Sequence, residues 1–389
     1  MLVRQTEPIS VSTKPVIRIG ELDGLRCFLS WWVVLVHILL SSGFRYETMP
    51  PFLRVIAKGE YPVDVFIILS GFVITRLLAE KQERYLVFIG RRFLRLFPVF
   101  AVTLLIAILL RPLLGRILAA GWPADPVILR NSLAAWENES RHFWAHLIAH
   151  LSILHGTVPS SILPGSATAF LAPAWSISLE WQYYLFAPLF ALICRKFGPL
   201  GWLALAVGSI LMLFHSGPIM SSSFPMQSFL PQKLLLFLVG GSCYWIFQEL
   251  AGKHADLPWL LFFFIAPAVL WFTLSVPLAI WTAAFALTLS GNRARGVSTL
   301  KAFLNLAWIR RLGEVSYSTY LVHPSCILLA QTCILVLIPS VARAEMLLGL
   351  LITTPILTFF ASEALFRFVE RPGIRLGRRL AQRSDADAA

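Results

Sequence analysis

Long runs of apolar residues, separated by short polar segments, follow one another along most of the chain. A helix that crosses a bilayer needs about 20 largely apolar residues, and ten runs approach that length. They lie near residues 25–42, 62–79, 96–114, 175–194, 199–215, 229–247, 258–272, 274–290, 316–338 and 345–367. The pattern predicts an all-α integral membrane protein of about ten transmembrane helices without a soluble domain.

The composition supports a location in the membrane. Hydrophobic residues make up 57% of the 389 residues and charged residues only 14%, whereas a soluble chain usually carries about 25% charged residues. With so little polar material, most of the surface must face lipid. The five cysteines lie in or at the ends of apolar runs, which argues against a disulfide framework.

Basic residues set the predicted orientation of the helices. The formal net charge is +13, and the excess lies in short clusters between apolar runs, so nucleic-acid binding is not expected. With the N-terminus in the cytoplasm, the inner side collects about three times as many lysines and arginines as the outer side. This bias predicts both termini in the cytoplasm, and the bacterial cytoplasmic (inner) membrane is the expected location.

The same scheme divides the chain into three parts. Residues 1–24 are expected to form a cytoplasmic N-terminal segment, 25–370 the transmembrane domain and 371–389 a basic cytoplasmic tail. Residues 115–174 form a long outer loop, and its apolar stretch 143–155 is too short to span. An interfacial or re-entrant helix is expected there.

Ionisable residues inside apolar runs are expensive to bury, and each therefore indicates a function. Arg26 and His37 are separated by about three helical turns, so they project from nearly the same face about 16 Å apart along the axis. Asp64 and Glu180 lie near the outer ends of the second and fourth runs. The structural alternatives are that Arg26 extends to the interface, that His37 and Glu180 satisfy buried hydrogen bonds, and that Asp64 caps its helix.

Five separated motifs carry a family resemblance. They are Leu22-Asp-Gly-Leu-Arg26 with His37, Val63-Asp-Val-Phe66 with Ser70-Gly-Phe72, Arg92-x-x-Arg95, Trp175-Ser-Ile-Ser-Leu-Glu180 and Val315-Ser-Tyr-Ser-Thr-Tyr-Leu-Val-His323. In this order, over essentially the whole chain, they resemble the membrane acyltransferase-3 family, which O-acylates glycans and lipids. Two positions depart from the family pattern: Cys27 stands where relatives often have Gly, and Lys233 where an Arg is common.

The resemblance implies an acyl-CoA donor, usually acetyl-CoA, that enters from the cytoplasm into a polar tunnel between the helices. Arg26, Arg92 and Arg95 are expected to bind this donor, since guanidinium groups suit phosphates. Ordinary topology charge is the alternative for Arg92 and Arg95. Ser316 and Tyr317 are expected to line the donor tunnel.

Two further residues of the last motif are given structural roles. Tyr320 is interpreted as an interfacial anchor. His323, which precedes Pro324, is interpreted as a hydrogen-bond donor within a kinked helix.

The catalytic residues expected from these positions are His37, Glu180 and Asp64. Imidazole can deprotonate a hydroxyl or attack a thioester near pH 7, so His37 serves either a direct transfer or an acyl-histidine relay. Glu180 is expected to orient or stabilise that imidazole, with a structural hydrogen bond as the alternative. Asp64 either binds an acceptor hydroxyl or caps its helix.

In the outer loop, His142, His146 and His150 recur every four residues. That spacing suits metal ligands on a helix, but the loop contains no cysteine. A polar surface that faces the acceptor is the preferred interpretation, and no metal is expected.

The predicted function is a membrane O-acyltransferase that moves an acyl group, expected to be acetyl, to a hydroxyl of an extracytoplasmic carbohydrate or glycolipid. A multi-span secondary transporter is the alternative, although the matching halves typical of transporters are not visible. A membrane scaffold would leave the buried ionisable residues unexplained. The expected partners are membrane lipid and a glycan or lipid-linked acceptor, and the oligomeric state is left open.

Overall fold

The computed structural model describes residues 19–81, 83–123, 125–250, 276–290 and 295–386, and in these ranges every regular element is helical. The long helices are α1 (Gly20–Ser41), α3 (Glu60–Glu80), α4 (Tyr85–Ala119), α7 (Ala174–Phe197), α8 (Pro199–Ser223), α9 (Leu230–Leu250), α14 (Ser316–Leu337) and α15 (Arg343–Leu365). In the described part of the chain, eight helical segments are long and apolar enough to cross a membrane. The protein is a multi-pass membrane protein.

Eight of the ten predicted spans coincide with these helices. The run at 274–290 forms α11 (Val276–Leu289), which is apolar but has only 14 residues. The run at 258–272 lies outside the described residues. The total of ten therefore stays a prediction.

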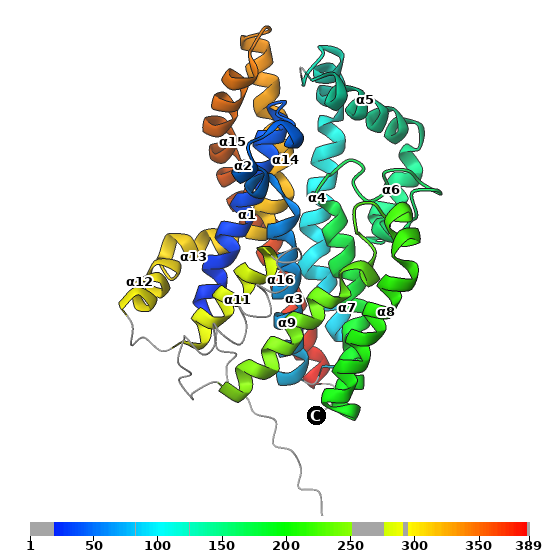
Figure 1. The fold of residues 1–389 in the computed structure, drawn as a ribbon, viewed down its shortest axis with the longest axis vertical. Coiled ribbons are helices and arrows are strands. Elements are labelled where there is room, and N and C mark those ends of the chain that lie inside the picture. Colours follow the sequence, from blue (N-terminus) through cyan, green and yellow to red (C-terminus); the bar gives the residue numbers. More distant parts are fainter. Residues whose placement is uncertain (1–18, 82, 124, 251–275, 291–294, 387–389) are drawn as a thin grey trace, which may run out of the picture.

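Shorter elements connect the long helices. They are α2 (Pro51–Ala57), α5 (Pro126–Arg141), α6 (Phe143–Leu151), α12 (Arg295–Leu304), α13 (Ala307–Glu314), α16 (Arg371–Ala386), the 3₁₀ turns η1 (Tyr46–Thr48) and η2 (His155–Thr157), and the π-helical turn η3 (Phe366–Glu370). Figure 1 places α2 and α5 towards the upper end of the bundle and α16 in its lower half. The short helix expected between residues 143 and 155 is α6.

Close backbone contact joins α3 to α9. A Cβ atom added at Gly240 would lie 1.8 Å from the carbonyl oxygen of Ile68, and one added at Gly71 would lie 2.1 Å from that of Phe237. Small residues at such positions let membrane helices approach closely. This contact fixes the two helices that carry Asp64 and Lys233.

The outward surfaces of the long helices are apolar. Leu109 on α4, Phe214 on α8 and Leu337 on α14 are all exposed. Lipid is a suitable neighbour for such side chains, because they have no polar atoms that would need a hydrogen-bond partner in the hydrocarbon region. The polar side chains described below lie between the helices instead.

Residues 371–386, predicted as part of a basic tail, form α16. This helix continues from α15 through the π-helical turn η3 and packs against α4, where a Cβ at Gly373 would lie 2.5 Å from the carbonyl oxygen of Leu94. A π-helical turn adds one residue to a helix and is frequent at functional sites. Its last residue, Glu370, contacts the site described next.

Candidate active site

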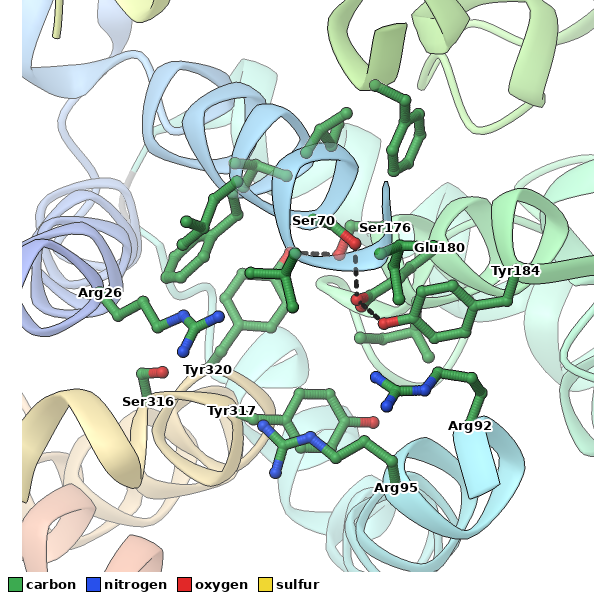
Figure 2. Close-up of a pocket in the computed structure, with 18 residues that line it drawn as sticks. Arg26, Ser70, Arg92, Arg95, Ser176, Glu180, Tyr184, Ser316, Tyr317 and Tyr320 are labelled. Carbon is green, nitrogen blue, oxygen red and sulfur yellow. Dashed lines mark hydrogen bonds between the residues drawn. The ribbon is translucent and has the colours of Figure 1, made fainter. Parts of the chain in front are cut away.

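A cavity of about 310 Å³ lies between α1, α3, α4, α7, α9 and α14 (Figure 2). Its wall is apolar in part, and its polar side chains come from Arg26, Ser70, Arg92, Arg95, Ser176, Glu180, Tyr184, Ser316, Tyr317 and Tyr320. Six of the eight residues singled out from the sequence are among them. The other two, His37 and Asp64, do not line this cavity.

The carboxylate of Glu180 lies in the cavity and accepts hydrogen bonds from two hydroxyls. Ser70 on α3 donates at 3.2 Å, and Tyr184, one turn further along α7, donates as well (Figure 2). These contacts join the second and fourth sequence motifs. The hydrogen-bond partners of Glu180 are thus hydroxyls of the cavity wall. His37, which Glu180 was expected to orient, lies instead 3.1 Å from His323.

Two tyrosines of α14 form another part of the wall. The Tyr320 hydroxyl lies 2.8 Å from Ser176 Oγ and donates to the carbonyl of Pro173 at 3.2 Å. The prediction that Tyr320 is an interfacial anchor is wrong, because its side chain is buried and its hydroxyl contacts residues at the start of α7. Tyr317 donates to the carbonyl of Leu96 at 2.8 Å, which joins the fifth motif to the residue that directly follows the third.

Arg95 is paired with a carboxylate that the sequence analysis did not single out. Its Nη1 donates to Glu370 Oε1 at 2.6 Å, and Ser318 Oγ donates to the other oxygen of Glu370 at 2.6 Å. The Glu370 side chain is fully buried, while that of Arg95 is 34% exposed. Glu370 therefore fixes one face of the guanidinium group, and the rest of the group faces the cavity.

Arg92 and Arg26 have weaker partners. The Arg92 guanidinium lies 5.7 Å from the ring centroid of Tyr184, and its buried Nε has no hydrogen-bond partner among the described residues. Arg26 Nη1 lies 3.2 Å from Asp23 Oδ1. Figure 2 shows the guanidinium groups of Arg26, Arg92 and Arg95 around the same space.

A second cavity of about 310 Å³ adjoins the first, because Arg26 and Arg92 line both. The second cavity lies near the start of α1 and the end of α3, where Arg76 and Glu80 form an ion pair at 2.9 Å. Two of the predicted donor-binding arginines thus stand between two spaces. An anionic group in either space can reach a cation.

His37 lies outside the first cavity and is paired with His323 of α14. His37 Nδ1 is 3.0 Å from the carbonyl oxygen of Val33 and 3.1 Å from His323 Nε2. The ring of His323 is in turn 6.2 Å from that of Tyr320, which does line the cavity. The histidine pair is therefore one turn of α14 away from the cavity wall, and His323 contacts another side chain rather than acting only within its own helix.

Asp64 forms an ion pair with Lys233. Its Oδ1 lies 2.7 Å from Lys233 Nζ, and both side chains are largely enclosed between α3 and α9. The sequence predicts either an acceptor-binding role or a helix cap for Asp64, and it marks Lys233 only as a departure from the family pattern. The contact adds a third role, which is neutralisation of a buried lysine.

Loss of one partner of this ion pair should destabilise the fold. Asp64→Asn leaves the Lys233 charge buried alone, which typically costs about 3–5 kcal/mol. The double variant Asp64→Asn/Lys233→Gln removes both charges and should recover most of the loss, as measured by thermal unfolding in one lipid environment. A double variant no more stable than Asp64→Asn would contradict this. If the double variant is stable, its rate of acyl transfer shows whether transfer needs the carboxylate of Asp64.

The expectation that the outer-loop histidines form a polar surface facing the acceptor is wrong for His146 and His150, whereas His142 is exposed. His146 and His150 of α6 are buried, and His150 stacks on the buried His155 with ring centroids 4.1 Å apart. Burial lowers the pKa of His155 to about 4 and that of His150 well below its usual value, so both rings are neutral near pH 7. In the described ranges, no group of three or more His, Cys, Asp or Glu residues could hold a metal ion.

The fold and the cavity define a multi-pass membrane protein with an arginine-lined space inside its helix bundle. The family model described as an acyltransferase domain, that of the acyltransferase-3 family, matches residues 19–362, and the chain belongs to this family.

Two curated proteins are similar to the chain in sequence. The acyltransferase MdmB of Streptomyces mycarofaciens is 29% identical over 213 residues, which cover 54% of this chain and 48% of the relative. The peptidoglycan O-acetyltransferase OatA of Listeria monocytogenes is 24% identical over 404 residues, which cover 91% of this chain and 55% of the relative. The chain thus spans about half the length of the curated relatives it matches. No solved structure matches it significantly.

Proposed function

We propose that the protein is a membrane O-acyltransferase that moves an acyl group from acyl-CoA to a hydroxyl of an extracytoplasmic carbohydrate or glycolipid. The observation that carries this proposal is the cavity in which three arginines, the half-buried carboxylate of Glu180 and several hydroxyls meet in a chain of the acyltransferase-3 family. A secondary transporter remains the alternative, because a polar cavity inside a bundle also suits a solute.

The donor binds, in this proposal, with its phosphates at the junction of the two cavities. Arg26 and Arg92 line both spaces, and guanidinium groups form strong, directional hydrogen bonds with phosphate. The apolar wall of the first cavity suits the pantetheine arm. This places the phosphates at the cytoplasmic side if both termini are cytoplasmic, as the distribution of lysines and arginines favours.

The thioester then lies towards Tyr320 and the histidine pair. His37 Nε2 removes the proton of the acceptor hydroxyl, and the oxygen attacks the thioester carbonyl. The C–S bond breaks, the thiolate of coenzyme A takes the proton from His37, and an ester is formed. In the alternative relay, His37 Nε2 attacks the thioester carbonyl first, the C–S bond breaks and the thiolate of coenzyme A leaves. The acceptor oxygen then attacks the acyl carbon, the bond between this carbon and His37 breaks, and the hydroxyl proton passes to the thiolate. Both routes end in the same ester and free thiol.

The acceptor class is proposed from chemistry and from one relative. The name of OatA states that it O-acetylates peptidoglycan, which makes acetyl the first donor group and carbohydrate hydroxyls the first acceptors to test. Lipid-linked sugars reach a membrane-embedded site equally well. The proposed location is the bacterial cytoplasmic membrane.

A transfer assay tests the function. Full-length protein in lipid nanodiscs is incubated with radiolabelled acetyl-CoA and, in separate reactions, peptidoglycan fragments and bacterial glycolipids. We expect label in an alkali-labile ester of the acceptor, and none without protein. Label that stays in acetyl-CoA with every acceptor, together with uptake of an unmodified solute by proteoliposomes, would favour the transporter instead.

A further inference from the structure

We propose that His323 is a positioning residue for His37: it accepts a hydrogen bond from the Nδ1–H of His37 and so leaves Nε2 of His37 free to take a proton. The inference rests on the proposed function in one respect, which is that His37 acts as the base or nucleophile. It assigns to His323 the orienting role that the sequence analysis gave to Glu180.

The geometry comes from two helices that are far apart in sequence. His37 Nδ1 lies 3.0 Å from the carbonyl oxygen of Val33 and 3.1 Å from His323 Nε2, and the two residues are 286 positions apart. On the other ring, His323 Nδ1 lies 3.3 Å from the carbonyl oxygen of Thr319. Each imidazole is thus held by a carbonyl of its own helix and by the other imidazole.

The two carbonyls determine where the protons lie. A carbonyl oxygen only accepts hydrogen bonds, so Nδ1 of His37 and Nδ1 of His323 must each carry a hydrogen to bond with it. In the neutral rings, both Nε2 atoms then bear a lone pair. The Nδ1–H of His37 is shared between the carbonyl of Val33 and His323 Nε2, as in other three-centre hydrogen bonds.

The reverse assignment is disfavoured by the same contacts. If His323 Nε2–H donated to a bare Nδ1 of His37, that nitrogen would set its lone pair against the Val33 oxygen at 3.0 Å. In neutral His323, Nδ1 would also be bare and would face the Thr319 oxygen at 3.3 Å. Two buried lone-pair contacts would replace two hydrogen bonds. The arrangement with His323 as acceptor avoids both costs.

This arrangement prepares His37 for proton transfer. When Nε2 takes the acceptor proton, the His37 ring becomes cationic, and its Nδ1–H···His323 bond becomes charge-assisted and stronger. His323 is fully buried, so water does not readily replace it. An acceptor at Nδ1 that orients the ring and stabilises the imidazolium is also what the third residue of a catalytic triad provides.

Two substitutions at His323 separate positioning from folding. In His323→Leu the acceptor is lost, and we expect kcat to fall by at least about 100-fold, within the range of a general base, with KM for acetyl-CoA changed by less than about two-fold. In His323→Gln the amide oxygen can still accept, and kcat should be at least about ten-fold higher than in His323→Leu. The matched control is His215→Leu, which removes an exposed imidazole on α8 and should leave both parameters unchanged.

A measurement without turnover distinguishes this inference from the proposed function. Nitrogen-15 NMR of histidine-labelled full-length protein in bilayers, with the His37 signal assigned from its loss in His37→Asn, reports which ring nitrogen is protonated. We expect Nδ1–H with a bare Nε2 in the wild type and a mixture in His323→Leu. An Nε2–H tautomer in the wild type, or a wild-type kcat in folded His323→Leu, overturns the inference. If the wild type transfers no acetyl group yet shows the Nδ1–H tautomer, the proposed function fails and the positioning contact stands.

Discussion

The His37→Asn variant should transfer acetyl groups about 10²–10⁴-fold more slowly than the wild type, which is the usual contribution of a general base. An asparagine amide cannot take up a proton near neutral pH, although it is polar and similar in size to imidazole. The affinity for acetyl-CoA should stay within about two-fold, because His37 does not line the cavity proposed to hold the donor. Single-turnover transfer and equilibrium binding of labelled donor measure the two effects separately.

Incubation of the wild-type protein with the donor alone distinguishes the two chemical routes, direct transfer and acyl-histidine relay. In a relay, wild-type protein mixed with labelled acetyl-CoA and no acceptor accumulates label on His37, which peptide mass spectrometry of quenched samples detects. In a direct transfer the protein stays unlabelled. His215→Asn on α8 serves as the control for loss of a remote, exposed imidazole. A folded His37→Asn protein with full transfer would exclude both routes.

The second large effect is expected at Arg92. Arg92→Gln should weaken acetyl-CoA binding about 10- to 100-fold, since a hydrogen bond to a charged group contributes about 1.5–3 kcal/mol. Stability should change little, because the Arg92 guanidinium lies over the rings of Phe88 and Tyr184 and its Nε has no hydrogen-bond partner among the described residues. Isothermal titration with acetyl-CoA measures the affinity, and thermal unfolding of the same preparation measures the stability.

Arg95 needs a different design from Arg92. Arg95→Gln leaves the buried Glu370 carboxylate without its cation, at a typical cost of about 3–5 kcal/mol, so a loss of binding could reflect misfolding. Arg95→Gln/Glu370→Gln removes both charges together and should restore most of the stability. If this double variant loses acetyl-CoA while Arg92→Gln binds it normally, the phosphate contact belongs to Arg95, and the role proposed for Arg92 is wrong.

The spans were predictable because bilayer thickness fixes how many apolar residues a crossing helix needs. Their ends were less predictable. The run at 96–114 is part of a 35-residue helix, Tyr85–Ala119, since arginines at 91, 92 and 95 end an apolar run without ending backbone hydrogen bonding. Helix α16 carries many arginines and little apolar sequence, so its sequence predicts a polar tail. Its packing became evident only from the structure, in which Gly373 and Gly377 lie against α4.

The cavity residues were predictable as far as each motif carries a polar side chain on a helix. The motifs do not indicate which helices pack against one another. His37 meets His323, and Arg95 meets Glu370, across 286 and 275 residues, and helical periodicity says nothing about such pairings. Glu370 also lies in a π-helical turn, whose extra residue rotates it away from the face that a regular α-helix would give. The available signal in the sequence was that Glu370 is the only acidic residue between Arg367 and Arg383, a stretch rich in arginine.

The separation between Arg95 and Glu370 has a consequence for biosynthesis. Arg95 leaves the ribosome 275 residues before its partner, so α4 enters the membrane with a guanidinium that has no carboxylate to meet. The Arg95–Glu370 pair can form only after η3 has been translated. A nascent chain that stops before residue 370 therefore has Arg95 without the carboxylate that pairs with it and α4 without the helix that packs against it.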